Sequence, residues 1–163
     1  MRTVGNWWGV TMHKTDRAIL RALQEDCSQS LGRISQKVEL SVTSCHRRIK
    51  TLESRGYIQS RRAILDSDAL GYAVKGIFMV RLFANGEPLA KQVNDRILSE
   101  PRVMSCYIAT GEYDFIITAR FRSTLDFNDY NDTFLERFSD LKIERVSSSL
   151  VLQTLHEHGG VPV

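Results

Sequence analysis

The chain has 163 residues, of which 42% are hydrophobic and 25% are charged, enough for one packed domain or two small ones. No stretch approaches the roughly 18 uninterrupted apolar residues of a membrane-spanning helix, and the start lacks the long apolar run of a signal peptide. Residues 1–72 hold 12 Lys and Arg against 7 Asp and Glu, whereas residues 73–163 hold 10 against 12. This basic first half predicts a nucleic-acid partner and no membrane.

Residues 1–13 are predicted to be an N-terminal extension. The part before Met12 has neither helical nor strand periodicity, and its adjacent tryptophans, Trp7 and Trp8, would be unusual to leave in water. Three interpretations stay open: a start assigned too far upstream, a disordered extension, or an arm that packs on another subunit. We expect the segment to be dispensable, since chain ends are commonly loose.

Two amphipathic helices are predicted next. Between Asp16 and Glu25, the apolar residues that turn inward are Ile19, Leu20 and Leu23. The short helix that follows has Leu31, Ile34 and Val38 on its inner face. With the apolar face of a third helix, these residues form a three-helix core.

The third helix begins after Ser41 and is the most informative segment of the chain. Cys45, Ile49 and Leu52 fall on one face at the spacing i, i+4, i+7, and basic and hydroxyl side chains fall on the opposite face. Ser41 stands at the N-cap position, and a capped helix N-terminus favours a nearby phosphate. A bracing helix followed by such a helix is the layout of a helix-turn-helix, whose second helix enters the DNA major groove. An ordinary amphipathic helix with a solvated basic face is the alternative.

Residues 57–65, entered through Gly56, are predicted to form a short hairpin, or wing. Arg61 and Arg62 on this hairpin either reach flanking phosphates or lie on a solvated edge. We assign residues 14–62 to a winged helix-turn-helix domain and residues 63–72 to a linker strand. The residues expected to bind DNA are Ser41, Thr43, Ser44, His46, Arg47, Lys50, Arg61 and Arg62.

Cysteine and histidine usage predicts no metal site and no cofactor. The three cysteines are odd in number and lack CxxC spacing, which is typical of reduced cytoplasmic thiols. His156 and His158 alternate near the end of the chain, and two histidines without a third ligand make a poor metal site.

Residues 73–155 are predicted to fold as a ferredoxin-like βαββαβ domain, with a tail over residues 156–163. The expected strands cover residues 73–83, 103–109, 115–121 and 145–155. One helix is expected over residues 87–99. A second follows a capping-box pattern at Ser123 and carries an apolar stripe of Phe127, Tyr130, Phe134 and Phe138. The whole chain is therefore expected to be an α+β protein of two domains.

One face of this sheet is predicted to pack against another copy of the chain. Both helices should cover the other face, which leaves Ile77, Met79, Phe83 and Ile116 among Lys75, Thr118 and Arg120. A purely solvated face would be more polar, so we expect a dimer built through the sheets.

Three segments resemble the Lrp/AsnC family, the feast/famine regulators of bacteria and archaea, within a similarity that spans residues 14–155. They are residues 15–20, residues 40–58, in which Cys45 stands shortly before the paired Arg47 and Arg48, and residues 111–115. The resemblance implies a winged helix-turn-helix joined by a linker strand to a regulatory domain that dimerises through its sheet. It further implies assembly of dimers into octamers or other higher oligomers, and an amino-acid effector held between regulatory domains.

The same resemblance implies where the effector binds. The implied contacts, some of them from a neighbouring subunit, are Met104, Gly111, Glu112, Tyr113, Asp114, Ser149 and Leu150. Backbone N–H groups freed at a glycine turn can hold a carboxylate, and Asp114 can hold an ammonium. The alternative is that Gly111 is only a turn glycine and Tyr113 only a core aromatic.

The chain departs from the family pattern at two places. Val42 and Ser44 stand where the family commonly has prolines, which leaves two backbone N–H groups at the helix start and brings Ser44 within reach of DNA. Lys142 and Ile143 stand where the family often has Pro-Gly, so the loop before the last strand is not fixed by the resemblance.

These observations predict a sequence-specific DNA-binding transcriptional regulator, cytoplasmic and nucleoid-associated, whose DNA binding or assembly responds to an amino acid. Its expected partners are double-stranded DNA, further copies of itself and that amino acid. One alternative is a tetrapyrrole (haem-precursor) decarboxylase of the same two-domain plan. No histidine lies between His46 and His156, so the regulatory domain lacks an obvious general acid and we expect no enzyme activity. A second alternative, an effector-independent DNA-architectural protein, stays open.

Overall fold

The computed structural model describes residues 12–83, 96–97, 99–157 and 159–163. The chain divides into a helical unit, Met1–Ala63 with His156–Val163, and a sheet unit, Ile64–Leu155. Residues 156–163, expected to form a separate tail, thus belong to the helical unit. The predicted extension before Met12 and most of the helix predicted over residues 87–99 lie outside the described residues.

Three helices form the helical unit, as predicted: α1 (Lys14–Glu25), α2 (Leu31–Lys37) and α3 (Val42–Ser54). Ser30 and Ser41 cap α2 and α3 by accepting the backbone N–H groups of Arg33 and Ser44. The buried core consists of Ile19, Ala22, Leu23, Ile34, Cys45, Ile49 and Leu52. The core confirms the predicted inner faces, although Leu20, Leu31 and Val38 are only partly buried against it and Ala22 is buried in addition.

The turn between α2 and α3 contains a residue with a positive φ, which the sequence pattern did not predict. Glu39 adopts a left-handed conformation, with φ of 54°, and the next N–H group, that of Leu40, donates to the carbonyl of Ser35 at 2.9 Å. A non-glycine residue pays a strain of about 1 kcal/mol in this conformation. The hydrogen bond from Leu40 to α2 holds the turn in this conformation.

The hairpin predicted over residues 57–65 is wrong, and so is the linker strand predicted over residues 63–72. Residues 58–66 have no regular structure and residues 67–71 form a turn, in which Asp66 Oδ1 accepts the N–H groups of Asp68 and Ala69. Residues 59–65 are exposed, and within residues 12–73 no second strand pairs with them. A two-stranded ribbon without a surface to pack on is marginal in water, which accounts for the difference.

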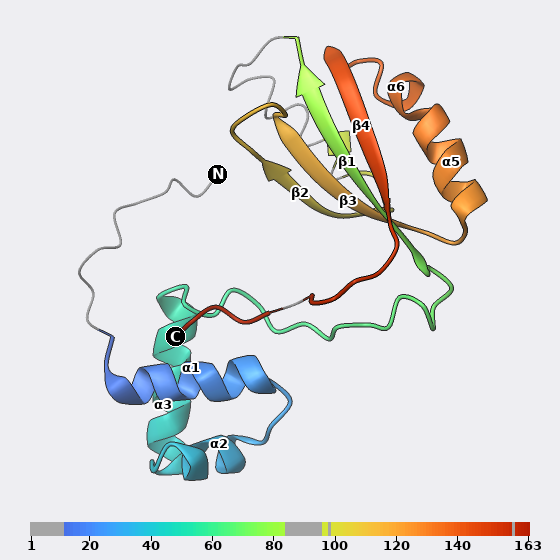
Figure 1. Cartoon of the computed structure of the whole chain (residues 1–163). Coiled ribbons are helices and arrows are strands. Elements are labelled where there is room, and N and C mark those ends of the chain that lie inside the picture. Colours follow the sequence, from blue (N-terminus) through green and yellow to red (C-terminus); the bar gives the residue numbers. More distant parts are fainter. Residues whose placement is uncertain (1–11, 84–95, 98, 158) are drawn as a thin grey trace. The chain divides into compact units, whose positions relative to one another are not determined.

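The sheet unit is a four-stranded antiparallel sheet in the order β2-β3-β1-β4 with α5 (Thr124–Asp132) and α6 (Phe134–Arg137) on one face (Figure 1). The strands are β1 (Val74–Leu82), β2 (Val103–Ile108), β3 (Phe115–Phe121) and β4 (Ile143–Val151). This order is that of a ferredoxin-like fold and confirms the predicted fold class. Strand β4 starts two residues before the predicted Arg145 and ends four residues before the predicted Leu155.

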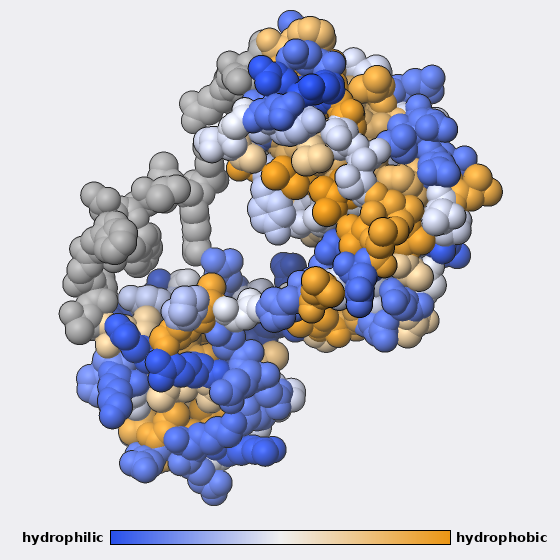
Figure 2. Space-filling model, in the orientation of Figure 1, coloured by the Kyte–Doolittle hydropathy of each residue, from blue (hydrophilic) through white to orange (hydrophobic). Residues whose placement is uncertain are grey.

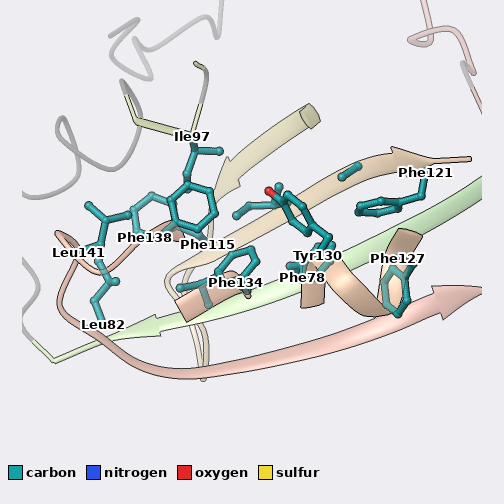
Figure 3. Close-up of a cluster of buried hydrophobic side chains, with 13 residues drawn as sticks. Phe78, Leu82, Ile97, Phe115, Phe121, Phe127, Tyr130, Phe134, Phe138 and Leu141 are labelled. Atoms are coloured by element: carbon teal, nitrogen blue, oxygen red, sulfur yellow. The ribbon is translucent and has the colours of Figure 1, made fainter. Parts of the chain in front are cut away.

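An aromatic cluster joins the helices to the sheet (Figure 3). Phe78 of β1 stacks on Phe134 with ring centroids 5.1 Å apart, and lies edge-on to Tyr130 at 5.5 Å. The predicted apolar stripe of four aromatic residues is thus confirmed, although the helix breaks at Thr133. Burial raises the pKa of the Tyr130 hydroxyl to about 12, so this hydroxyl stays neutral at physiological pH.

The opposite face of the sheet carries the side chains predicted for it. Strand register pairs Lys75 with Arg120, Ile77 with Thr118 and Met79 with Ile116, all out of step with the core residue Phe78. Ile77 and Met79 are half-buried within one chain. We call this surface the open face.

Gly76 is required by the aromatic cluster. A Cβ atom at this position would lie 2.7 Å from Phe127 Cε2 and 3.0 Å from Phe121 Cε2, and neither ring has room to retreat. We expect Gly76→Ala to lower the free energy of unfolding by about 1–3 kcal/mol, in urea unfolding followed by circular dichroism.

Gly32→Ala is the matched control for this substitution. A Cβ atom there would find its nearest neighbour, Ser30 Oγ, at 4.0 Å, so α2 gains an alanine without a clash. Equal stability of the two variants would contradict the tight packing of Gly76.

Candidate functional site

The inner face of α3 fixes its orientation in the helical unit. Cys45, Ile49 and Leu52 are buried, and burial raises the pKa of the Cys45 thiol, which therefore behaves as a small apolar side chain. Arg48 Nη1 binds Asp16 Oδ1 of α1 at 2.8 Å, and both side chains are partly buried. This ion pair joins α1 to α3, so Arg48 has a structural partner while its neighbour Arg47 points outward.

The predicted DNA-binding residues lie on the outward side of α3 and just after it. Thr43, His46, Arg47 and Lys50 are exposed, as the helical periodicity predicts. Ser41 and Ser44 interact with each other, because Ser41 accepts the N–H of Ser44 and donates its hydroxyl to Ser44 Oγ at 2.9 Å. Figure 2 shows that hydrophilic side chains cover most of the visible surface of the helical unit.

Glu53, which the sequence reasoning missed, binds two of the predicted cations. Its carboxylate accepts from Lys50 Nζ at 2.9 Å and from Arg61 Nη2 at 3.0 Å. The hydrogen bond from Lys50 lowers the pKa of Glu53, and the charges of Lys50 and Arg61 add to that effect. The i, i+3 spacing of Lys50 and Glu53 was the available signal. Arg61 is thereby held at the end of α3, whereas Arg62 is exposed.

This arrangement suits the recognition of duplex DNA. A helix with an exposed arginine, histidine and threonine can reach base edges, and arginine in particular can bind guanine through two hydrogen bonds. The cations near the end of α3 can bind phosphates, which position a protein without reading sequence.

The predicted effector turn is held to the end of β1 by hydrogen bonds of Asp114. Gly111 has a φ of 120°, which favours glycine, and Asp114 accepts the N–H of Leu82 through its carboxylate at 2.9 Å. The N–H of Asp114 donates to the carbonyl of Val80, also at 2.9 Å. The carboxylate of Asp114 is therefore already engaged with the end of β1, whereas Glu112 is exposed.

Two arginines that sequence reasoning missed surround this turn. Arg145 of β4 forms an ion pair with Glu112 and lies over the ring of Tyr113, 5.1 Å from its centroid. Arg81 of β1 donates to the carbonyl of Glu112 at 3.0 Å and binds Glu144 at 3.0 Å. The hydrogen bond to Glu112 raises the pKa of Arg145, so this cation is permanent. Their separation from the turn by more than thirty residues in sequence hides them from motif reading.

The other predicted effector residues lie level with the middle of β1, away from this turn. Ser149 pairs with Ile77, whose partner in β3 is Thr118, and Met104 precedes the residue that pairs with Thr118. Ile77 and Val80 are three positions apart in β1, which is roughly 10 Å along a strand. One chain therefore does not bring the two groups together. Leu150 packs against the aromatic core, while Ser149 and Met104 are exposed.

Some kinds of site do not occur in the described part of the chain. Among residues 12–83, 96–97, 99–157 and 159–163, no group of three or more His, Cys, Asp or Glu side chains is placed to hold a metal ion. The helices of these same residues include none that is long and apolar enough to cross a membrane.

Family models match both units of the chain. A model of winged helix-turn-helix DNA-binding domains matches residues 12–59, and a model of the Lrp/AsnC ligand binding domain matches residues 76–161.

Individual proteins are similar along nearly the whole chain. The proline dehydrogenase transcriptional activator of Rhizobium radiobacter is 31% identical, over 90% of this chain and 97% of that protein. The transcriptional regulator AzlB of Bacillus subtilis is 30% identical, over 95% and 98%. Among solved structures, an AsnC family transcriptional regulator from Agrobacterium tumefaciens has a TM-score of 0.83 at 26% identity, covering 93% of this chain and 97% of that one. The L-Met complex of a transcriptional regulator from Neisseria meningitidis also has a TM-score of 0.83, at 27% identity and the same coverage.

Proposed function

Because the chain belongs to the Lrp/AsnC family of transcriptional regulators and has both its DNA-binding and its ligand-binding domain, we propose that an amino acid bound to the sheet unit modulates how the helical unit binds operator DNA. The observation that carries this proposal is the exposed outer face of α3, which presents Thr43, His46 and Arg47 beside cations held by Glu53. The named relatives are transcriptional regulators, which favours regulation over catalysis.

In this proposal, α3 reads the major groove and the segment after it binds the backbone. Arg47 and Thr43 face base edges, because both oppose the buried stripe of α3. The remaining contacts, to phosphates or flanking bases, come from Ser41, Ser44, His46, Lys50, Arg61 and Arg62.

The effector is proposed to be an amino acid bound at the turn of residues 111–114. The arginines Arg81 and Arg145 offer cations for its carboxylate, and Glu112 offers an acid for its ammonium. Met104 and Ser149 of a neighbouring subunit, both exposed, complete the site, with Tyr113 and Asp114 shaping the turn, whereas the predicted contact Leu150 packs against the aromatic core. The L-Met complex of the Neisseria meningitidis regulator supports a ligand of this class.

The smallest functional assembly is proposed to be a dimer formed through the open face. Ile77, Met79 and Ile116 give this face an apolar centre, which a second copy would remove from water. A dimer then binds a pseudo-palindrome whose half-sites are about one helical turn apart, roughly 34–36 Å, or a multiple of it.

Arg47→Ala tests the DNA contact. Loss of one good base contact should weaken operator binding by about 1–3 kcal/mol without changing the melting temperature, since Arg47 is exposed. Fluorescence anisotropy with a labelled operator at moderate salt measures the effect. Lys142→Ala removes one exposed positive charge from the sheet unit and should leave affinity unchanged. Equal affinities of the two variants would exclude the orientation assigned to α3.

A thermal-shift screen of the twenty amino acids tests the effector. A ligand present at 100 times its Kd stabilises the folded state by about 2.7 kcal/mol, an easily measured shift. Glu112→Gln should abolish the shift given by the active amino acid, whereas Glu136→Gln, at an exposed position of α6, should retain it. A screen without a positive amino acid would contradict this class of effector.

Met79→Glu tests the dimer. A carboxylate at the centre of the open face would be buried against its own copy, so light scattering should show a shift from dimer toward monomer. Leu125→Glu places the same charge at an exposed position of α5, on the other side of the sheet, and should leave the dimer intact. A wild-type protein that is monomeric at micromolar concentration would contradict the proposed dimer.

A further inference from the structure

The end of the chain packs on the helical unit and lines a groove there. Residues Gly159–Val163, here called the strap, follow the sheet unit in sequence but group with α1–α3, and Figure 1 shows the C-terminal end beside these helices. Together with α1 and residues 57–61, the strap lines a groove of about 430 Å³. Its apolar lining includes Leu20, Leu23 and Tyr57, and the strap contributes Val161, Pro162 and Val163.

Gln24 of α1 binds the strap through both ends of its side-chain amide. Gln24 Nε2 donates to the carbonyl of Val161 at 2.8 Å, and the N–H of Val161 donates to Gln24 Oε1 at 3.1 Å. In an extended segment the N–H and C=O of one residue point to the same side, so a single amide satisfies both, as a neighbouring strand would. Arg21 Nε adds a hydrogen bond to the carbonyl of Val163 at 2.7 Å.

The local sequence suits this conformation. Pro162 restricts the preceding Val161 to extended backbone, which lowers the entropy cost of binding. A Cβ atom on Gly160 would lie 2.2 Å from Gln24 Nε2, so a larger residue would displace the amide that holds Val161. Gly160 and Pro162 thus satisfy two separate requirements of the same groove.

We propose that the strap is a second connection between the two units and that it stabilises residues 57–61, the segment after α3. The first connection is the chain between Ala63 and Val74. Residues 57–61 line the same groove as α1 and the strap, and they include Arg61, which also binds Glu53 of α3. A bound strap therefore supports Arg61, which places a cation beside α3. Because the strap follows β4 in sequence, a change in β4 can be transmitted to the proposed DNA-binding surface.

Hydrogen exchange on the full chain tests the docking directly. The Val161 amide should exchange about tenfold or more slowly than in an unstructured peptide, because Gln24 accepts its proton. Gln24→Ala should remove that protection and speed exchange over residues 57–61. Gln36→Ala, the same change at an exposed position of α2, should alter neither. An unprotected Val161 amide in the wild type would overturn the proposal, as would unchanged exchange at residues 57–61 in Gln24→Ala.

Operator binding by Gln24→Ala and by a chain ending at Leu155 tests the bracing role, which rests on the proposed DNA binding. Both should bind several-fold more weakly than the wild type, with unchanged dimer mass. Affinity equal to that of the wild type in both would overturn the role of the strap in DNA binding. A wild type that fails to bind DNA would instead contradict the proposed function, and hydrogen exchange would still report whether the strap is seated.

Discussion

Strand β1 imposes the main constraint on the sheet unit, because both of its edges are paired and its side chains must alternate. The residues in phase with Phe78 have to fit the aromatic cluster, and the closest approach there leaves no room for a Cβ atom at Gly76. Residues out of phase are placed on the open face by the same period of two. A shift of one residue would exchange the two sets, so core packing and the proposed self-association depend on one register.

Periodicity was sufficient to predict the elements whose burial is decided within one chain. The stripe of α3 and the aromatic residues of α5 and α6 repeat at helical spacing, and the strands alternate in the expected phase. Prediction failed where a segment needs a surface beyond its own residues. The hairpin after Gly56 and the linker strand have β-type sequences, but the hydrogen bonds that make a strand must come from another strand. A break such as that at Thr133 depends on how α5 fits the sheet, which no local pattern records.

In the candidate sites too, the parts that follow from local periodicity could be predicted, and the contacts with distant segments could not. The outward side of α3 follows from geometry alone, so its exposed residues could be named in advance. The hydrogen-bond and ion-pair partners of the effector turn could not be predicted, because Asp114 binds to β1 and Arg145 reaches Glu112 from a distant strand. These contacts arise from register between strands rather than from sequence proximity. The recruitment of Gln24 by the last residues of the chain is a further case.

Glu53 acts as a built-in counterion for the recognition surface. Lys50 and Arg61 already bind a carboxylate, so in the proposed complex with DNA each would exchange one oxygen anion for another. Binding of a phosphate by a bare cation expels a condensed salt ion from DNA, and that release favours association at low ionic strength. Here part of this gain is offset by displacing Glu53, which the phosphates repel. A surface of this kind holds DNA less tightly at random sequences than its number of cations implies, and it leaves a larger share of operator selection to the uncompensated side chains of the helix.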